Sequence, residues 1–299
     1  MQATYKKQVQ LLLNVLPEVA KEECFALHGG TAINLFVRDM PRLSVDIDLT
    51  YVPIQDRKIS VQAISEALER IKANVERVIP GARVTHLKDT AKLQVFAGGV
   101  EIKLEVNLTN RGTLSPPRKM ELCDKAQTEF DTFFEMPVVS LGQLYGGKII
   151  AALDRQHPRD LFDVKGLLAT EGITLEVKEG FIHYLLCSDR PIGEVVVPNF
   201  QDQRAAMDNH FSGMTDEEFD YVEYERVRGR LVKVLFDNLT DKDKDFILSV
   251  KNVTPDWRIY DFERFPGIKW KIYNLAKFKA ESPEKHRAAY EALAKKLNR

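Results

Sequence analysis

The chain has 299 residues, of which 44% are hydrophobic and 29% charged, and its formal net charge is −1. This composition is typical of a soluble globular protein of about two domains, and it excludes a uniformly basic nucleic-acid-binding protein. The three cysteines, Cys24, Cys123 and Cys187, lie far apart, which excludes a disulfide framework and a cysteine-based zinc site. From the cysteines we expect a reducing, cytoplasmic environment. We also expect no membrane segment, because no apolar run approaches the roughly 20 residues that span a bilayer.

The first part of the chain, residues 1–138, combines helical and strand patterns and predicts a mixed α/β domain. Within 44–52, apolar residues alternate with polar ones, as in a strand with one buried face. The expected elements are a helix over 1–17, a strand over 25–28, a helix after the double glycine 29–30, a strand over 44–52, a helix over 56–79, and a hairpin of strands over 91–97 and 100–109.

The second part, residues 139–299, is predicted to be a helical domain, with the boundary placed near residue 138. Helical patterns follow Ser140 and Pro158, and helices predominate to the end of the chain. Residues 264–299 hold ten Lys or Arg against three Glu, with aromatic residues between them. This segment predicts either a nucleic-acid-binding surface or a pair of amphipathic helices with solvated lysines.

Two aspartates, Asp46 and Asp48, are two positions apart in a predicted strand, so both carboxylates project from one face. Close carboxylates repel each other, and a divalent cation bound between them relieves the repulsion. Glu105 lies on the polar face of the strand over 100–109 and is the candidate third ligand. Such a set can hold two Mg²⁺ ions, whereas the plainer interpretation is a solvated strand face.

A turn of sequence Gly29-Gly30-Thr31 precedes the two aspartates and joins a strand to a helix. Glycines allow the main chain to approach a ligand closely, and the first amides of a helix bind anions. The Thr31 hydroxyl could add a phosphate contact. Alone, this would be an ordinary turn, but together with the carboxylates it predicts a site for a metal-bound nucleoside triphosphate.

Lys148 and Asp160 complete the set of candidate residues. The spacing Gly142…Gly147-Lys148 matches a P-loop, but Ile149 replaces the required Ser or Thr and the segment is predicted to be helical, so we reject a P-loop. Lys148 could balance triphosphate charge or be a surface lysine. Asp160 near the start of its helix could be functional or could stabilise the helix dipole.

The segments HGGTAINLF, RLSVDIDL, IKLEVN and GGKIIAALDRQHPRDLFDV, in this order, resemble the AbiEii/AbiGii family of nucleotidyltransferase toxins, which includes MenT-like toxins. The resemblance covers residues 25–170 and implies an α+β fold, with a DNA polymerase β-like N-terminal domain followed by a helical domain. It also implies an abortive-infection or toxin–antitoxin system used in phage defence, with a cognate antitoxin encoded nearby.

The resemblance assigns roles to the candidate residues. It implies that the phosphates lie at Gly29, Gly30 and Thr31, with Arg42 and Ser44 beside them; that Asp46 and Asp48, with Glu105, bind metal; that Lys148 binds the nucleotide; and that Asp160 is the essential acid of the last motif.

The expected function is therefore transfer of a nucleoside monophosphate from an NTP to an acceptor hydroxyl, with Mg²⁺ or Mn²⁺ as cofactor. The resemblance favours the 3′ end of tRNA as the acceptor, so that translation is blocked. The alternatives are transfer of a nucleotide or a phosphate to a protein hydroxyl, and a non-catalytic nucleotide-binding module.

Overall fold

The computed structural model describes residues 1–298 of the chain. They divide into two compact units. Unit 1 comprises Met1–Ser140 together with Asp208–Glu218, and unit 2 comprises Leu141–Met207 together with the chain from Phe219 onward. Each unit has its own core and is described separately.

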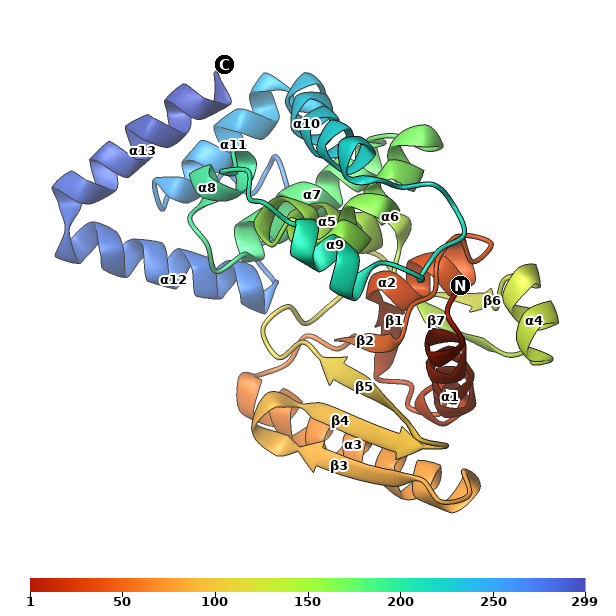
Figure 1. Cartoon of the computed structure of the whole chain (residues 1–299). Coiled ribbons are helices and arrows are strands. Elements are labelled where there is room, and N and C mark those ends of the chain that lie inside the picture. The colour runs from red at the N-terminus through yellow and green to blue at the C-terminus, as the bar shows by residue number, and fades with distance from the viewer. Residues whose placement is uncertain (299) are drawn as a thin grey trace. The chain divides into compact units, whose positions relative to one another are not determined.

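Unit 1 is built on one mixed β-sheet and several helices (Figure 1). Its elements in chain order are α1 (Ala3–Val19), β1 (Phe25–His28), α2 (Gly29–Ala32), the π-helix η1 (Ile33–Val37), β2 (Asp46–Tyr51), α3 (Arg57–Val78), β3 (Arg83–Leu87), the 3₁₀-helix η2 (Lys88–Thr90), β4 (Lys92–Ala97), β5 (Val100–Val106), β6 (Arg118–Glu121), α4 (Asp124–Phe130) and β7 (Glu135–Val138).

The seven strands are ordered β3-β4-β5-β2-β1-β7-β6. Strand β1 pairs antiparallel with β2 and parallel with β7, and β2 pairs parallel with β5. The remaining neighbours pair antiparallel, including the predicted hairpin of β4 and β5. This mixed sheet, together with the helices of unit 2, confirms the predicted α+β fold class.

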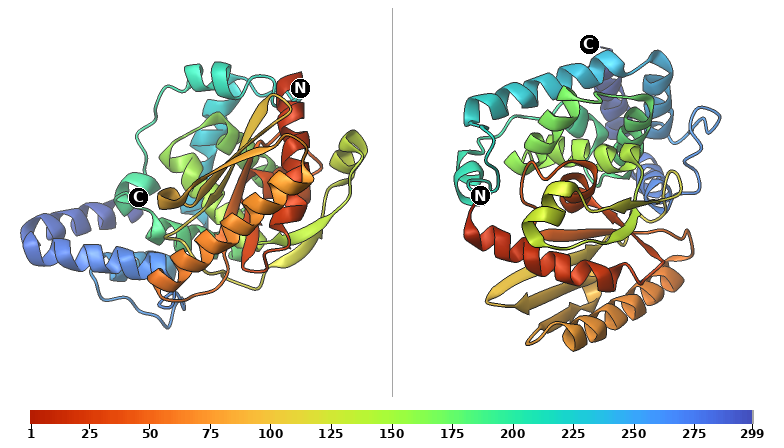
Figure 2. Two further views of the ribbon diagram at one scale, coloured as in Figure 1. Left: turned by 90° about the horizontal axis from the view of Figure 1, so that it is seen from below. Right: turned by 90° about the vertical axis from the view of Figure 1, so that its right-hand side faces the viewer.

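The alternating pattern of β2 separates the two faces of the sheet. Ile47 and Leu49 are buried, and they lie beside the buried Leu104 and Val106 of β5. Helices α1 and α3 contact each other and the strands β3 to β5, as Figure 2 shows, so they cover this apolar face. The opposite face keeps the polar residues of β2, β4 and β5 and forms the candidate site.

The segment Asp208–Glu218 belongs to unit 1 although it is far from the rest of that unit in the sequence. The Leu43 amide donates to the Met214 carbonyl (2.7 Å), and the Thr215 hydroxyl donates to the Pro41 carbonyl (2.8 Å). Near the N-terminus, the Gln2 amide donates to the Gly213 carbonyl (2.8 Å). This segment therefore holds the loop that leads into β2.

Unit 2 is helical. Its elements are α5 (Leu141–Asp154), α6 (Pro158–Ala169), α7 (Leu175–Cys187), α8 (Ile192–Val196), α9 (Arg204–His210, whose last turn belongs to unit 1), α10 (Tyr221–Asn238), α11 (Asp241–Lys251), α12 (Pro266–Glu281) and α13 (Pro283–Leu297). Within residues 1–298, none of the helices has both the length and the apolar character needed to cross a membrane.

Helices α5 and α7 approach each other through glycines. A Cβ atom at Gly180 of α7 would lie 1.8 Å from the carbonyl oxygen of Gly142. A Cβ at Gly146 would lie 2.2 Å from the carbonyl carbon of Gly180. Two glycines of the P-loop-like segment therefore serve helix packing, and α5 confirms that this segment is helical.

We predict that Gly180→Ala lowers the free energy of unfolding by about 1–3 kcal/mol or more, because the new methyl group meets main-chain atoms that cannot move aside. The matched control is Gly229→Ala on α10, where a Cβ has no neighbour within 4 Å. That control should stabilise the protein by about 0.5–1 kcal/mol, because alanine favours a helix more than glycine does. Urea unfolding of both variants tests the packing, and equal effects would contradict it.

The core of unit 2 also contains a buried histidine. His183 packs edge-on against the rings of Tyr184, Phe262 and Phe265. Burial, reinforced by the positive charge of Arg264, lowers the pKa of His183 to about 3. The unfolded chain, in which a histidine has a pKa of about 6.5, therefore binds more protons than the folded protein at mildly acidic pH.

We predict that His183 contributes to acid sensitivity. As the pH falls from about 6.5 towards 3, protonation of His183 in the unfolded chain lowers the free energy of unfolding. In His183→Phe, the difference in that free energy between pH 7 and pH 4.5, measured by urea unfolding, should be smaller than in the wild type. An unchanged difference would contradict the buried, neutral state of His183.

Candidate active site

The two aspartates of β2 lie on the polar face of the sheet, as predicted. Asp46 and Asp48 are half-buried, and the residues between and after them are buried on the other face. The strand register places Asp48 directly opposite His28 of β1 on one side and Glu105 of β5 on the other. Since neighbouring strands of a sheet lie about 4.8 Å apart, Asp48 and Glu105 are neighbours on this face.

Glu105 also has a partner on the next strand. Lys92 of β4 lies opposite it, and the lysine Nζ donates to Glu105 Oε1 at 2.8 Å. Both side chains are more than a third exposed, and an ion pair of this kind contributes only about 0–1 kcal/mol. A cation could therefore displace Lys92 at little cost, so the pair does not exclude Glu105 as a ligand.

Gly29 lies in contact with the Asp48 carboxylate. Its φ angle is +72°, and a Cβ at this position would lie 2.0 Å from Asp48 Oδ2. Any side chain would therefore displace the carboxylate, in addition to straining the main chain. The close approach of the main chain to Asp48 therefore explains why the first residue of the turn is a glycine.

Gly30 lies beside two further predicted residues. A Cβ at Gly30 would lie 2.8 Å from the Arg42 guanidinium and 3.0 Å from Ser44 Oγ. Arg42 is almost completely buried, and its guanidinium donates to the Leu43 carbonyl at 2.8 Å. The structure thus brings the turn, Arg42 and Ser44 together.

Thr31 connects the turn to the aspartate strand. Its buried hydroxyl donates to the main-chain carbonyl of Asp46 (2.5 Å) and lies 3.1 Å from Ser44 Oγ. This hydrogen bond holds Asp46, the first residue of β2, in place. The structure therefore uses Thr31 to hold the turn against β2, and its contact with a phosphate stays a prediction.

The donor set of this face fits Mg²⁺ only in part. Within residues 1–298, no group of three His, Cys, Asp or Glu is arranged as a complete metal site. Mg²⁺ is usually held by one or two carboxylates together with substrate phosphates and water rather than by an all-protein cage. The pair Asp46 and Asp48, with the side-chain-free Gly29 beside them, fits this mode of binding.

In unit 2, Lys148 and Asp160 belong to a buried cluster of charges. Lys148 Nζ lies 2.8 Å from Asp160 Oδ1 and 3.0 Å from Asp163 Oδ2. Arg155 donates to both oxygens of Asp160, at 2.6 and 3.0 Å. Because Lys148 and both aspartates are buried, the interpretation of Lys148 as a surface lysine is wrong.

The cluster sets the charge state of Asp160. Burial alone would raise the pKa of this carboxyl, but the charges and hydrogen bonds of Lys148 and Arg155 outweigh burial and hold the pKa well below its usual value. Asp160 is therefore an anion throughout the physiological range. Two positively charged and two negatively charged side chains are paired among the four residues. Their bonds connect α5 and the residue that follows it to α6.

We predict that Asp160→Asn destabilises the protein by about 3–5 kcal/mol, because it leaves Lys148 and Arg155 without their shared carboxylate. The matched control is Asp154→Asn, which removes the exposed ion pair of Asp154 with Arg190 and should cost about 1 kcal/mol or less. Thermal and urea unfolding measure both. Equal costs would contradict a structural role of the buried cluster.

Lys92 and the segment Asp208–Glu218 were not singled out from the sequence. Lys92 lies in the same cross-strand row as Asp48, and the segment supports the loop that carries Arg42. The period-two pattern of β4 placed Lys92 on the polar face, but pairing with Glu105 depends on strand register. No local signal indicated the distant segment.

Comparisons with known proteins show the family and the fold of the chain. The family model described as "Nucleotidyl transferase AbiEii toxin, Type IV TA system" matches residues 10–265. Among solved structures, MenT4, a nucleotidyltransferase toxin from Mycobacterium tuberculosis H37Rv, superposes with a TM-score of 0.58 at 14% identity, covering 92% of this chain and 95% of that one. The curated protein sequences contain no match. The chain therefore belongs to the AbiEii family of nucleotidyl transferase toxins, of type IV toxin–antitoxin systems.

Proposed function

We propose that this protein transfers a nucleoside monophosphate from an NTP to an acceptor hydroxyl and releases pyrophosphate, with Mg²⁺ or Mn²⁺ as cofactor. The observation that carries the proposal is the carboxylate pair Asp46 and Asp48 on the polar face of the sheet, with Asp48 directly against Gly29 of the turn. Membership in a nucleotidyltransferase family supports the reaction class.

Asp46 and Asp48 would hold the cofactor, with Glu105 as a further ligand once Lys92 moves aside. The bound metal would lower the pKa of the acceptor hydroxyl and neutralise charge on the triphosphate. The main chain at Gly29 and Gly30, which carries no side chain to exclude a phosphate, would receive the triphosphate. Arg42 beside Gly30 would supply a fixed positive charge there.

Thr31 and Ser44 would position other groups of the site. The Thr31 hydroxyl holds the turn against the Asp46 carbonyl, so that the phosphate-binding turn and the carboxylates keep their spacing. For unit 2, we retain the roles that the family resemblance implies, with Lys148 binding the nucleotide and Asp160 as the essential acid of the last motif. We add that Asp160 orients the Lys148 ammonium group, which the hydrogen bond between them supports.

The proposed acceptor is the 3′ end of tRNA, and the proposed partner is a cognate antitoxin encoded nearby, in keeping with a type IV toxin family. The direct test incubates the purified protein with Mg²⁺, total tRNA and each α-³²P-labelled NTP in turn. Label on tRNA from one NTP would identify the acceptor and the base together. Label on protein instead would support the protein-modifying alternative, and no label on either would contradict the proposed reaction.

We predict that Asp46→Asn lowers the rate of transfer by about 100-fold or more, because metal stabilisation of the transition state amounts to several kcal/mol and each 1.36 kcal/mol is a tenfold change in rate. Asp89→Asn, an equally conservative change at an exposed position of η2, is the matched control and should keep full activity. Circular dichroism should show both variants folded. Full activity of folded Asp46→Asn would reject the proposed role of this carboxylate.

A further inference from the structure

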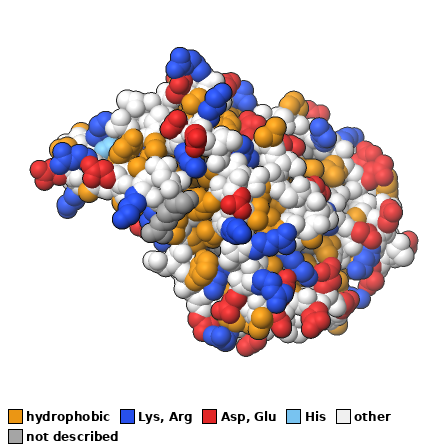
Figure 3. Space-filling view, turned by 90° about the horizontal axis from the view of Figure 1, so that it is seen from above, with side chains coloured by type: hydrophobic (Ala, Val, Ile, Leu, Met, Phe, Trp, Pro, Cys, Tyr) orange, Lys and Arg blue, Asp and Glu red, His pale blue; other side chains and the backbone are white. Residues whose placement is uncertain are grey.

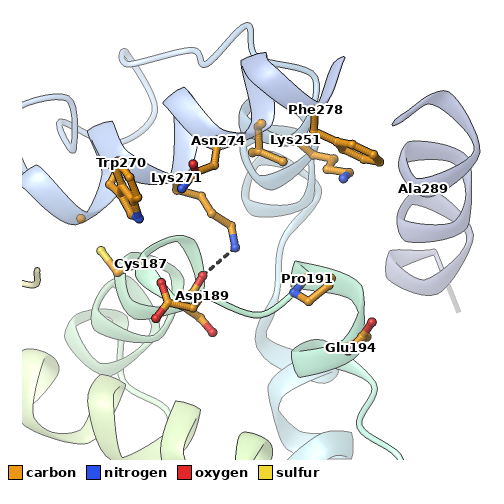
Figure 4. A pocket seen from close by; sticks show the side chains of 13 residues that line it. Cys187, Asp189, Pro191, Glu194, Lys251, Trp270, Lys271, Asn274, Phe278 and Ala289 are labelled. Atoms are coloured by element: carbon orange, nitrogen blue, oxygen red, sulfur yellow. Dashed lines mark hydrogen bonds between the residues drawn. The ribbon is translucent and has the colours of Figure 1, made fainter. Parts of the chain in front are cut away.

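Unit 2 contains a cavity of about 380 Å³, a volume within the range of small-molecule sites. It is lined by the C-terminal end of α7, the start of α8, and parts of α11, α12 and α13, and it opens to solvent (Figure 4). Every residue that lines it belongs to unit 2, whereas Asp46 and Asp48 belong to unit 1. The cavity is therefore a feature of its own, and neither the family description nor the proposed reaction uses it.

A buried lysine without an acidic partner lines this cavity. Lys251 is only 9% exposed. Within residues 1–298, no hydrogen-bond acceptor or carboxylate contacts its ammonium group, which lies 5.4 Å from the ring centre of Phe278. Burial lowers the pKa of Lys251. Lys251 lines the cavity, and its nitrogen is not among the buried polar atoms that lack a partner, so the ammonium group is open to solvent and available to an anion in the cavity.

A second lysine adds positive charge to the same cavity. Lys271 donates to the main-chain carbonyls of Ser188 (2.6 Å) and Arg190 (2.7 Å), which follow the last turn of α7. Burial lowers its pKa to about 8, against the opposing effect of Asp189. An ammonium group has three donors, so one donor of Lys271 is left for an anion. The carboxylates of Asp189 and Glu194 also line the cavity, and Glu194 is paired with Arg190.

The walls of the cavity suit a flat ring. Trp270, Leu275 and Phe278 of α12 supply an apolar surface, and the Asn274 amide can both donate and accept hydrogen bonds. Trp270 is 52% exposed and stacks on Tyr273, which is 62% exposed, with ring centres 5.7 Å apart. An exposed stacked pair at the rim of a cavity is a platform on which heterocyclic rings can stack.

Two of the remaining basic side chains of residues 264–298 have main-chain partners within unit 2. Lys279 donates to the Asn252 carbonyl (2.8 Å) and Lys296 to the Gly193 carbonyl (2.7 Å), so both are engaged in holding helices together. On the face drawn in Figure 3, basic and acidic side chains are intermixed. Lys279 and Lys296 are therefore engaged within unit 2.

We propose that this cavity binds a single nucleotide, with its phosphate at Lys251 and its base against Trp270 and Asn274. The nucleotide is either a free monophosphate or the terminal residue of a single-stranded RNA, since both offer the same phosphate and ring. The proposal does not depend on the transfer reaction, because its residues and its readout are separate from Asp46 and Asp48.

The test is calorimetric titration of the full-length Asp46→Asn/Asp48→Asn protein, without divalent cations, with adenosine 5′-monophosphate, adenosine, inorganic phosphate and a short single-stranded oligoribonucleotide. We expect the monophosphate to bind more tightly than adenosine or phosphate. Lys251→Met, introduced into this protein, should weaken its binding about tenfold or more, because a charge-assisted hydrogen bond is lost. Lys242→Met on the exposed face of α11 is the matched control and should leave binding within about twofold.

Two further readouts separate the proposal from a structural role. Lys251→Met should unfold at the same temperature as its parent or higher, because it replaces an unpaired buried charge with an apolar group. Trp270→Ala removes an exposed ring and should also weaken monophosphate binding. Tighter binding of the oligoribonucleotide than of the monophosphate would assign the site to an RNA end, and the reverse would assign it to a free nucleotide. Unchanged binding in both Lys251→Met and Trp270→Ala would overturn the proposal.

Discussion

The contact between the Gly29 main chain and the Asp48 carboxylate constrains the whole candidate active site of unit 1. Because a Cβ atom at Gly29 would lie 2.0 Å from Asp48 Oδ2, the turn can approach β2 only with glycine at this position. The hydrogen bond from the Thr31 hydroxyl to the Asp46 carbonyl also holds the turn against β2. Arg42 and Ser44 then fall beside Gly30, so a surface for phosphates and a pair of carboxylates for a cation are built by one short stretch of chain.

Unit 2 depends on a comparable close approach and on a buried set of charges. The α5–α7 contact requires Gly142, Gly146 and Gly180, and it fixes the helix that carries Lys148. Lys148 in turn joins α5 to α6 through Asp160 and Asp163. Buried ion pairs of this kind add little net stability over an apolar core, but they are costly to break. Loss of activity in a variant of Lys148 or Asp160 therefore has to be separated from loss of folding.

Strands β2, β4 and β5 and the position of the aspartates could be predicted from the sequence, because alternation of polar and apolar residues decides which face of a strand is buried. Strands β3, β6 and β7 were not predicted. The helix over 56–79 was predictable from apolar residues at helical spacing, and the hairpin of β4 and β5 from two alternating runs joined by a double glycine. The structure confirms both. What the sequence could not predict depends on long-range geometry. The pairing of Glu105 with Lys92 follows from register, the burial of Lys148 from tertiary packing, and the attachment of Asp208–Glu218 from main-chain bonds that leave no local pattern.

The central claim is that Asp46 and Asp48 hold the metal of a nucleotidyltransferase site. Anomalous scattering from crystals grown with Mn²⁺ and a non-hydrolysable NTP analogue tests it most directly, because it locates the metal without relying on activity. The account predicts a peak within about 2.2 Å of carboxylate oxygens of Asp46 and Asp48, with the triphosphate against the turn at Gly29 and Gly30. Binding of the metal away from this pair, with Asp46 and Asp48 left uncoordinated, would contradict it.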